Sequence, residues 1–400
     1  MKESGIVRAD NKARNDIGEG DSCCRSSSCR DTAIPLQFAG KESQLIDLKH
    51  KPGWVLDTIK TPAGSFFRVE TGLSWSDRRG GIKSRISAFR MKYSVPPGLY
   101  AVGSPDKDSG VFVSANYKLS FDKLRNSLKE MNAWILVLDT KGINVWCAAG
   151  KGTFGTEELV NRISQTQLDK VVEHRRLIVP QLGAVGVNAK NVRERTGFRV
   201  YFGPVYAKDI PEYVNSGYKK SKGMRIIRFT LWDRMALTPM EINPAMKKYY
   251  PWYALAVLLI FGAQPSGILF KDAFAGGFPF LVLGLVSVIA GAFLTPALLP
   301  FIPFRSFAVK GWIVGIVSIY LSMNYFAIVP VDGLILQLVS YLFFPLLASY
   351  IALQFTGSTT FTGMSGVNKE LRIGLPVYIA GAGTSVILSI IYKLGLWGVL

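Results

Sequence analysis

Cys147 and the small residues around it are the part of this sequence best suited to chemistry. The thiol lies in the run Asn-Val-Trp-Cys-Ala-Ala-Gly-Lys, residues 144–151, between the apolar run 133–138 and a helical pattern that begins near Thr156. We therefore expect it in a loop between a strand and a helix, with Thr156 as the helix cap. Small neighbours let a large flat ligand approach the backbone, and a helix N-terminus favours the thiolate that binds metals. A buried structural cysteine is the alternative interpretation, because free cysteines are commonly inert.

An α/β domain over residues 98–235 is expected to position this loop. Apolar runs that predict strands alternate with helical patterns: strands at 111–113, 133–138, 177–179, 198–202 and 226–231, and helices at 121–131, 168–174 and 209–214. Such alternation predicts a Rossmann-like, mostly parallel sheet, whose ligands bind beyond the carboxyl ends of its strands. The run 133–138 is apolar throughout, as in a sheet covered on both faces.

Three further loops follow predicted strands at the same edge, at 114–118, 180–186 and 203–209. They offer small or amide-bearing residues, and the candidates for ligand binding are Ser114, Asn116, Gln181, Leu182, Gly183, Gly203 and Pro204. Each loop alone is ordinary loop chemistry. Together with the Cys147 run they predict the rim of one ligand site.

The chain before this domain is expected to differ in character. Residues 1–40 predict a disordered polar leader, and residues 41–97 a β-rich extension with strands at 54–56, 66–69 and 86–93 and a turn at 77–81. Cys23, Cys24 and Cys29 lie in the leader, and none is spaced as C-x-x-C. Neither a zinc site nor an iron–sulfur cluster is therefore predicted from them.

Composition changes sharply near residue 248. Residues 251–400 hold six Lys/Arg against three Asp/Glu, so only +3 of the total net charge of +19 lies there and +16 lies on the first 250 residues. A basic half joined to an apolar half suggests contact with an anionic membrane leaflet or with acidic partners. Nucleic acid is not expected as a partner, because no RNP, zinc-finger or helix-turn-helix signature occurs.

An all-α domain of five transmembrane helices is predicted over residues 251–400, after a connector helix at 236–250. The expected spans are 251–270, 276–299, 307–329, 333–354 and 373–398, each near the ~20 residues that cross a bilayer. Cations gather on one side of them, at Lys247, Lys248, Arg305, Lys310, Lys369 and Arg372. The positive-inside rule then predicts a multi-pass protein of the inner (cytoplasmic) membrane, with residues 1–248 cytoplasmic and Leu400 outside. A membrane scaffold or transporter with a nucleotide-like ligand is an alternative, although ionisable residues are scarce inside the spans.

A family resemblance sharpens this picture. Residues 144–151 resemble, at every position, the cap-helix motif N-(V/I)-W-C-A-(A/S)-G-K of the mercury-methylation corrinoid family, HgcA. Segments 115–122 and 180–183 resemble the related corrinoid iron–sulfur protein of the acetyl-CoA pathway, so the likeness covers roughly 98–234. Val185 and Val187 depart from the more Pro-rich loop expected there. The resemblance implies a corrinoid cofactor, cobalamin-type, with cobalt at its centre.

The same resemblance assigns roles. Cys147 would be the catalytic residue and the lower axial ligand of cobalt, and the corrinoid would also contact Asn144, Val145, Trp146, Ala148, Ala149, Gly150 and Lys151 together with the residues of the three further loops. The implied activity is that of a membrane-anchored, corrinoid-dependent methyltransferase that passes a methyl group from cobalt to Hg(II) to give methylmercury. A folate-derived methyl donor and a ferredoxin-like electron donor with two 4Fe–4S clusters would be its partners. The alternative is a corrinoid methyl carrier of the acetyl-CoA (one-carbon) pathway.

Overall fold

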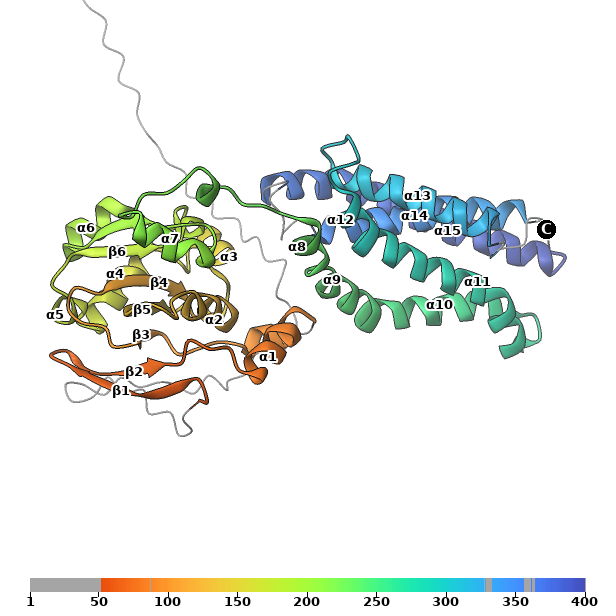
Figure 1. Cartoon of the computed structure of the whole chain (residues 1–400). Coiled ribbons are helices and arrows are strands. Elements are labelled where there is room, and N and C mark those ends of the chain that lie inside the picture. The colour runs from red at the N-terminus through yellow and green to blue at the C-terminus, as the bar shows by residue number, and fades with distance from the viewer. Residues whose placement is uncertain are drawn as a thin grey trace, which may run out of the picture. The chain divides into compact units, whose positions relative to one another are not determined.

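A mostly parallel sheet is the frame of the N-terminal half in the computed structural model, which describes residues 52–86, 88–326, 328, 333–355, 361 and 364–399 (Figure 1). Its seven strands in the described chain run in the order β1-β2-β3-β5-β4-β6-β7. Their bounds are β1 Val55–Thr61, β2 Gly64–Val69, β3 Gly98–Val102, β4 Gly110–Ala115, β5 Ala133–Leu138, β6 Arg176–Val179 and β7 Arg199–Phe202. The predicted leader lies outside the described residues.

The order of the parallel strands creates a switch point between β4 and β6. Strands β5, β4, β6 and β7 are mutually parallel neighbours, whereas β3 runs antiparallel to β5. The chain leaves β4 for β5 on one side, and then returns across the sheet to β6 on the other side. Loops after β4 and β6 therefore diverge at the carboxyl edge, which is where open α/β sheets bind ligands.

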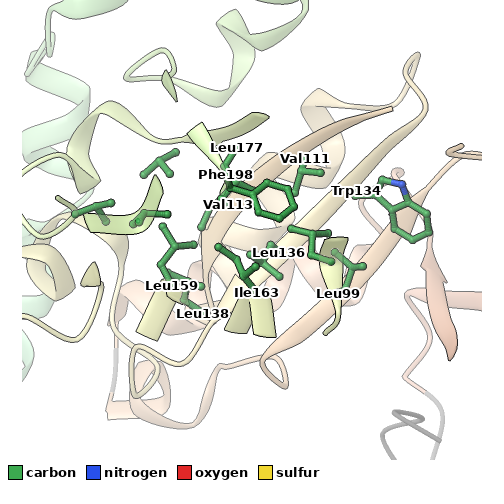
Figure 2. Packing of buried hydrophobic residues seen from close by; sticks show 14 of the residues in the cluster. Leu99, Val111, Val113, Trp134, Leu136, Leu138, Leu159, Ile163, Leu177 and Phe198 are labelled. Atoms are coloured by element: carbon green, nitrogen blue, oxygen red, sulfur yellow. The ribbon is translucent and has the colours of Figure 1, made fainter. Parts of the chain in front are cut away.

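Helices cover both faces of this sheet, as the apolar run 133–138 predicts. Alternate strand residues on one face, including Val111, Leu136 and Leu177, pack against α4 (Thr156–Gln165), α5 (Leu168–Val171) and α6 (Ala189–Thr196) (Figure 2). On the other face, Phe112 and Ile135 pack against α2 (Lys118–Ser127) and α7 (Ile210–Asn215). The predicted α/β class is confirmed for this half of the chain.

Helix α1 (Trp75–Ile86) corrects two predictions, the turn at 77–81 and the strand at 86–93. Residues 88–92 form the short 3-10 helix η1 (Ala88–Lys92) instead. The reason is tertiary, because the buried Asp77 carboxylate pairs with Lys118 (2.7 Å) and Arg125 (2.8 Å) of α2. Gly80 and Gly81 of α1 permit close packing against the domain. A Cβ at Gly81, for example, would lie 3.3 Å from a methyl carbon of Leu119.

The predicted strand at 226–231 is also wrong. It follows the 3-10 turn η4 (Gly223–Arg225), pairs with no strand in the described chain, and ends where α8 (Leu231–Met235) begins with a Thr230–Asp233 capping box. Strand β3 was not predicted, because it begins at a Pro-Pro-Gly run that is typical of a turn. Helix α6 was not predicted, because its sequence is almost entirely polar. The helices predicted at 121–131 and 168–174 end earlier, at Ser127 and Val171.

Four helices in the described chain are long and apolar enough to cross a membrane, where five were predicted. They are Phe270–Leu298 (α11, η6 and α12), Phe307–Asn324 (α13), Leu334–Phe355 (α14) and Gly366–Leu396, the greater part of α15 (Met364–Leu396). The exception is α10 (Tyr250–Gly262), whose 13 residues rise about 20 Å against a hydrocarbon core of about 30 Å. It ends in the hairpin of β8 (Ala263–Gln264) and β9 (Gly267–Ile268), and α15 begins well before the predicted residue 373.

The polypeptide nevertheless passes along this helical bundle five times. The connector helix α9 (Thr238–Pro244) and the π-helical turn η5 (Ala245–Tyr249) continue directly into α10. Before them, Arg234 donates to the carbonyl of Ala297 at the end of α12 (3.3 Å); after them, Trp397 beyond α15 donates to Gln264 (3.1 Å). The run 238–262 thus reaches from one end of the bundle to the other, antiparallel to α11.

Small residues join α13 to α14. A Cβ built on Gly311 would lie 2.5 Å from the Cβ of Ala352, and one on Gly315 would lie 2.9 Å from the Cβ of Ala348. Glycines four residues apart let two helix backbones approach closely, which is typical of helix pairs inside membranes.

Candidate functional site

Cys147 lies in a short helix, α3 (Val145–Gly150), rather than in the predicted loop. Asn144 is the N-cap, and its side-chain oxygen accepts a hydrogen bond from the Cys147 amide (3.0 Å). Asparagine is among the preferred N-cap residues because it satisfies an amide that no helical carbonyl reaches. The motif therefore encodes a capped helical turn, with the thiol-bearing residue at its third position.

The faces of α3 differ in exposure. Val145, Ala148 and Ala149 are buried against the sheet, whereas Cys147 is half-buried and Gly150 exposed. Residues three apart share a helix face, so Cys147 and Gly150 lie together on the outer side. A Cβ on Gly150 would meet no atom within 4 Å. Cys147 is free in the described chain and is only half-buried, whereas a structural core cysteine would be fully buried.

A cavity of about 300 Å³ opens at the switch point beside α3. Of the predicted site residues, those that line it are Ser114, Asn144, Val145, Trp146, Leu182, Gly203 and Pro204. Three predicted loops and the start of α3 therefore meet at one place. The remaining predicted residues do not line the cavity: Asn116, Cys147, Ala148, Ala149, Gly150, Lys151, Gln181 and Gly183.

The walls of the cavity are apolar side chains that sequence reasoning did not single out, namely Phe112, Val113, Leu124, Ile178 and Ile210. They come from the ends of β4 and β6 and from the helices α2 and α7. The sequence could have indicated the strand residues among them, because these stand directly before the predicted loops at the carboxyl edge of the sheet. Their convergence depends on strand order, which the sequence does not state.

Asn116 does not line the cavity but holds the loop that leads into α3. Its side chain is 6% exposed, and its oxygen accepts hydrogen bonds from the Thr140 amide (3.1 Å), the Thr140 hydroxyl (2.8 Å) and the Gly142 amide (2.9 Å). These bonds fix the loop from β5 to Asn144. Burial alone would raise the pKa of Asp139 in this loop, but hydrogen bonds from Lys141 outweigh it and lower that pKa. Asn116 is therefore a positioning residue for α3.

Gly183 and its neighbours pack against the segment that follows α3. A Cβ on Gly183 would lie 2.5 Å from the ring of buried Phe154, so this glycine is required by the fold. The predicted cap at Thr156 is wrong, because Gly155 is the N-cap of α4 and the Thr156 hydroxyl accepts from the amide of Asn188 (2.8 Å). Gln181 accepts a hydrogen bond from Lys220. The loop after β6 thus packs against the segment that joins α3 to α4.

Comparison with a known protein family bears on this domain. Residues 89–214 match the family of the CO dehydrogenase/acetyl-CoA synthase delta subunit. The delta-subunit family region contains α3, the loops after β4, β5, β6 and β7, and thus every predicted site residue. The predicted relation to proteins of the acetyl-CoA pathway is confirmed for residues 89–214, as similarity to this family.

Named relatives resemble a part of this chain of similar length. The acetyl-CoA decarbonylase/synthase complex subunit gamma of Methanopyrus kandleri is 32% identical over 127 residues, 31% of this chain and 27% of that protein. The corrinoid/iron-sulfur protein large subunit of Moorella thermoacetica is 28% identical over 120 residues, 30% of this chain and 26% of that protein. The chain spans about a quarter of the length of these relatives.

Proposed function

We propose that this chain is a membrane-anchored corrinoid protein that receives a methyl group and passes it on. The Moorella relative is named as a corrinoid protein, and the family match over residues 89–214 contains α3 and most residues of the switch-point cavity. A corrinoid supplies a cobalt centre that can accept and release a methyl group. The observation that carries the proposal is a free cysteine on the open face of a capped helix at that edge.

The residues at the edge fit a large, flat, metal-centred ligand. Gly150 and Gly152 both face space in which an added Cβ would meet no atom within 4 Å, and Cys147 shares the outer side of α3 with Gly150. Cys147 would hold the metal of such a ligand through its sulfur, because a thiolate is a good ligand for a soft metal. Trp146, Leu182 and Pro204 line the cavity beside it and would exclude water from the edge of the ring.

Hg(II) is the acceptor that we propose. A bound corrinoid would supply a transferable methyl group, and Cys147 as a metal ligand would favour its transfer to an electrophile, because a thiolate donates more electron density than an imidazole or water does. Thiol-bound Hg(II) is a soft electrophile. The match of residues 144–151 to the cap-helix motif of the mercury-methylation family supports this choice.

A methyl carrier of the acetyl-CoA pathway is the second candidate, and the similarity to subunits named for that pathway favours it. Both candidates need a folate-derived methyl donor and low-potential electrons, for which a ferredoxin-like protein with two 4Fe–4S clusters is the proposed partner. The two differ in the acceptor, and therefore in the ligand that best tunes cobalt.

We also propose a multi-pass location in the inner membrane. Four helices suit a bilayer, and α9, η5 and α10 together make a fifth pass along the same bundle. Within that pass, Lys247 and Lys248 lie in η5, directly before the apolar helix α10, so the positive-inside rule puts residues 1–248 on the cytoplasmic side. Five passes then put Leu400 on the opposite side.

Anaerobic loading of the detergent-purified full chain with a corrinoid tests the proposal in two steps. We expect uptake of cobalamin by wild type, and a visible spectrum that changes in Cys147→Ala and in Cys147→His. Methylmercury should then form from Hg(II) when a methyl donor and the ferredoxin-like partner are supplied, and not with Cys147→Ala. No uptake by wild type contradicts the whole proposal. Uptake with transfer only to the acetyl-CoA-forming system, and none to Hg(II), selects the second candidate.

A further inference from the structure

Helix α1 buries polar and small residues and exposes large apolar ones, the reverse of an ordinary surface helix. Its buried residues are Asp77, Gly81 and Ser84, which follow one another at helical spacing and face the domain. Asp77 is held there by Lys118 and Arg125, and the Ser84 hydroxyl donates to the carbonyl of Gly81 (2.9 Å). The contact of α1 with its own domain therefore depends on charge pairing and small residues.

The large apolar side chains of α1 point the other way. Trp75 is 77% exposed, Ile82 57% and Ile86 44%, and they alternate on one outer stripe with Arg78, Arg79 and Lys83. The stripe continues into η1, where Met91 is 57% exposed beside Lys92. Folding of the domain makes no use of this apolar surface, which a soluble surface helix would bury.

A membrane interface can bind both the apolar and the basic side chains of this stripe. The aromatic ring prefers the headgroup level, and the apolar side chains enter the boundary of the acyl chains. Basic residues near an anionic surface each favour binding by about fivefold. The chain's own apolar helices place a bilayer within reach of the domain, so no other protein is required to supply it.

We propose that the outer stripe of α1 (Trp75, Arg78, Arg79, Ile82, Lys83 and Ile86) binds the headgroup region of an anionic phospholipid leaflet. Charge complementarity selects this occupant, because the stripe carries three cations and no carboxylate. The inference rests on the proposed membrane location and is independent of corrinoid binding. Its consequence is that the corrinoid domain is held against the membrane surface by α1 as well as through the linker.

Photocrosslinking of the full chain in nanodiscs tests the proposal. p-Benzoylphenylalanine replaces Trp75 or Ile82, and for the control it replaces Glu194, an exposed residue of α6. The nanodiscs contain either phosphatidylcholine alone or phosphatidylcholine with phosphatidylglycerol. We expect lipid adducts at positions 75 and 82 but not at 194, with at least about fivefold more adduct in the anionic discs.

Charge variants separate lipid binding from simple proximity to the bilayer. Arg78→Glu combined with Arg79→Glu should reduce the anionic-lipid adduct at Ile82 by more than about fivefold, while Arg78→Lys with Arg79→Lys keeps it. Corrinoid uptake measured in parallel should be unchanged in both, and Cys147→Ala should keep its lipid adducts. Equal adducts at positions 75, 82 and 194, or adducts insensitive to lipid charge, would overturn the proposal. So would crosslinks from position 75 to an acidic protein partner with none to lipid.

Discussion

The side-chain oxygen of Asn144 accepts a hydrogen bond from the backbone amide of Cys147, 3.0 Å away. The residue that begins α3 thus also orients the residue that carries the thiol. Because α3 has only six residues, this cap satisfies a large share of its unpaired amides. The helix that presents Cys147 depends on Asn144 more than a long helix would.

Replacing Asn144 by alanine should loosen α3 without unfolding the domain. Loss of an N-cap costs about 1 kcal/mol, so amide exchange across residues 145–150 should accelerate about fivefold. Hydrogen exchange of the full chain, read by mass spectrometry, measures this. Asn144→Asp keeps an acceptor at the cap and should exchange like wild type. Identical exchange in wild type and Asn144→Ala would contradict the assigned role.

Replacing Asn116 by alanine should destabilise the whole α/β domain. Three donors that now meet its buried oxygen would lose their acceptor, at a total cost of about 3 kcal/mol. Urea unfolding followed by near-ultraviolet circular dichroism measures the loss. The control is Asn188→Ala, which removes an exposed N-cap of α6 and should cost only about 1 kcal/mol. Equal losses in the two variants would show that Asn116 does no more than an ordinary cap.

Two glycines near α3 should respond oppositely to substitution. Gly183→Ala forces a Cβ to within 2.5 Å of the Phe154 ring and should cost about 1–3 kcal/mol of stability. Gly150→Leu enters open space and should leave the unfolding transition unchanged. If a corrinoid ring lies over that face, Gly150→Leu should instead weaken corrinoid uptake by at least about tenfold, a loss of 1.4 kcal/mol in binding. Undiminished uptake by Gly150→Leu would place the ring elsewhere.

Acid should weaken the attachment of α1. Burial would raise the pKa of Asp77, but hydrogen bonds from Lys118 and Ser74 and the charges of Lys118 and Arg125 lower it from 3.8 to about 2. The folded-state pKa lies below the unfolded one, so the stabilisation is complete above about pH 5 and is lost as pH falls toward 2. Its size is about 2 kcal/mol.

Urea midpoints of the full chain between pH 7 and pH 3 measure this contribution of Asp77. Asp77→Asn should be destabilised at pH 7, because it leaves buried cations without a partner, and its stability should vary less with pH. Asp57→Asn is the control, since Asp57 pairs with Arg68 on an exposed strand and should alter stability by less than about 1 kcal/mol. A pH profile of Asp77→Asn that parallels wild type would remove Asp77 as the cause.

Local pattern was enough to predict several features from the sequence. Buried parallel strands are apolar throughout, so the run 133–138 predicted the β5 that the structure contains. Long apolar segments predicted the helices that are long and apolar enough to cross a membrane, since a helix in lipid must be apolar along its whole length. The run 144–151 marked Cys147 because its residue types follow one another without interruption.

Tertiary structure alone decided features that depend on distant partners. Gly80 and Gly81 read locally as a turn, and only the pairing of Asp77 with Lys118 and Arg125, about forty residues onward, makes α1 a helix. Asn116 and Gly183 stay predicted ligand contacts, and only the structure shows that they also contact Thr140 and Phe154 and so support α3. Sequence thus determined which residues could do chemistry, because residue type and spacing are local. Strand order and packing determined which of them meet, because those depend on contacts between segments far apart in the chain.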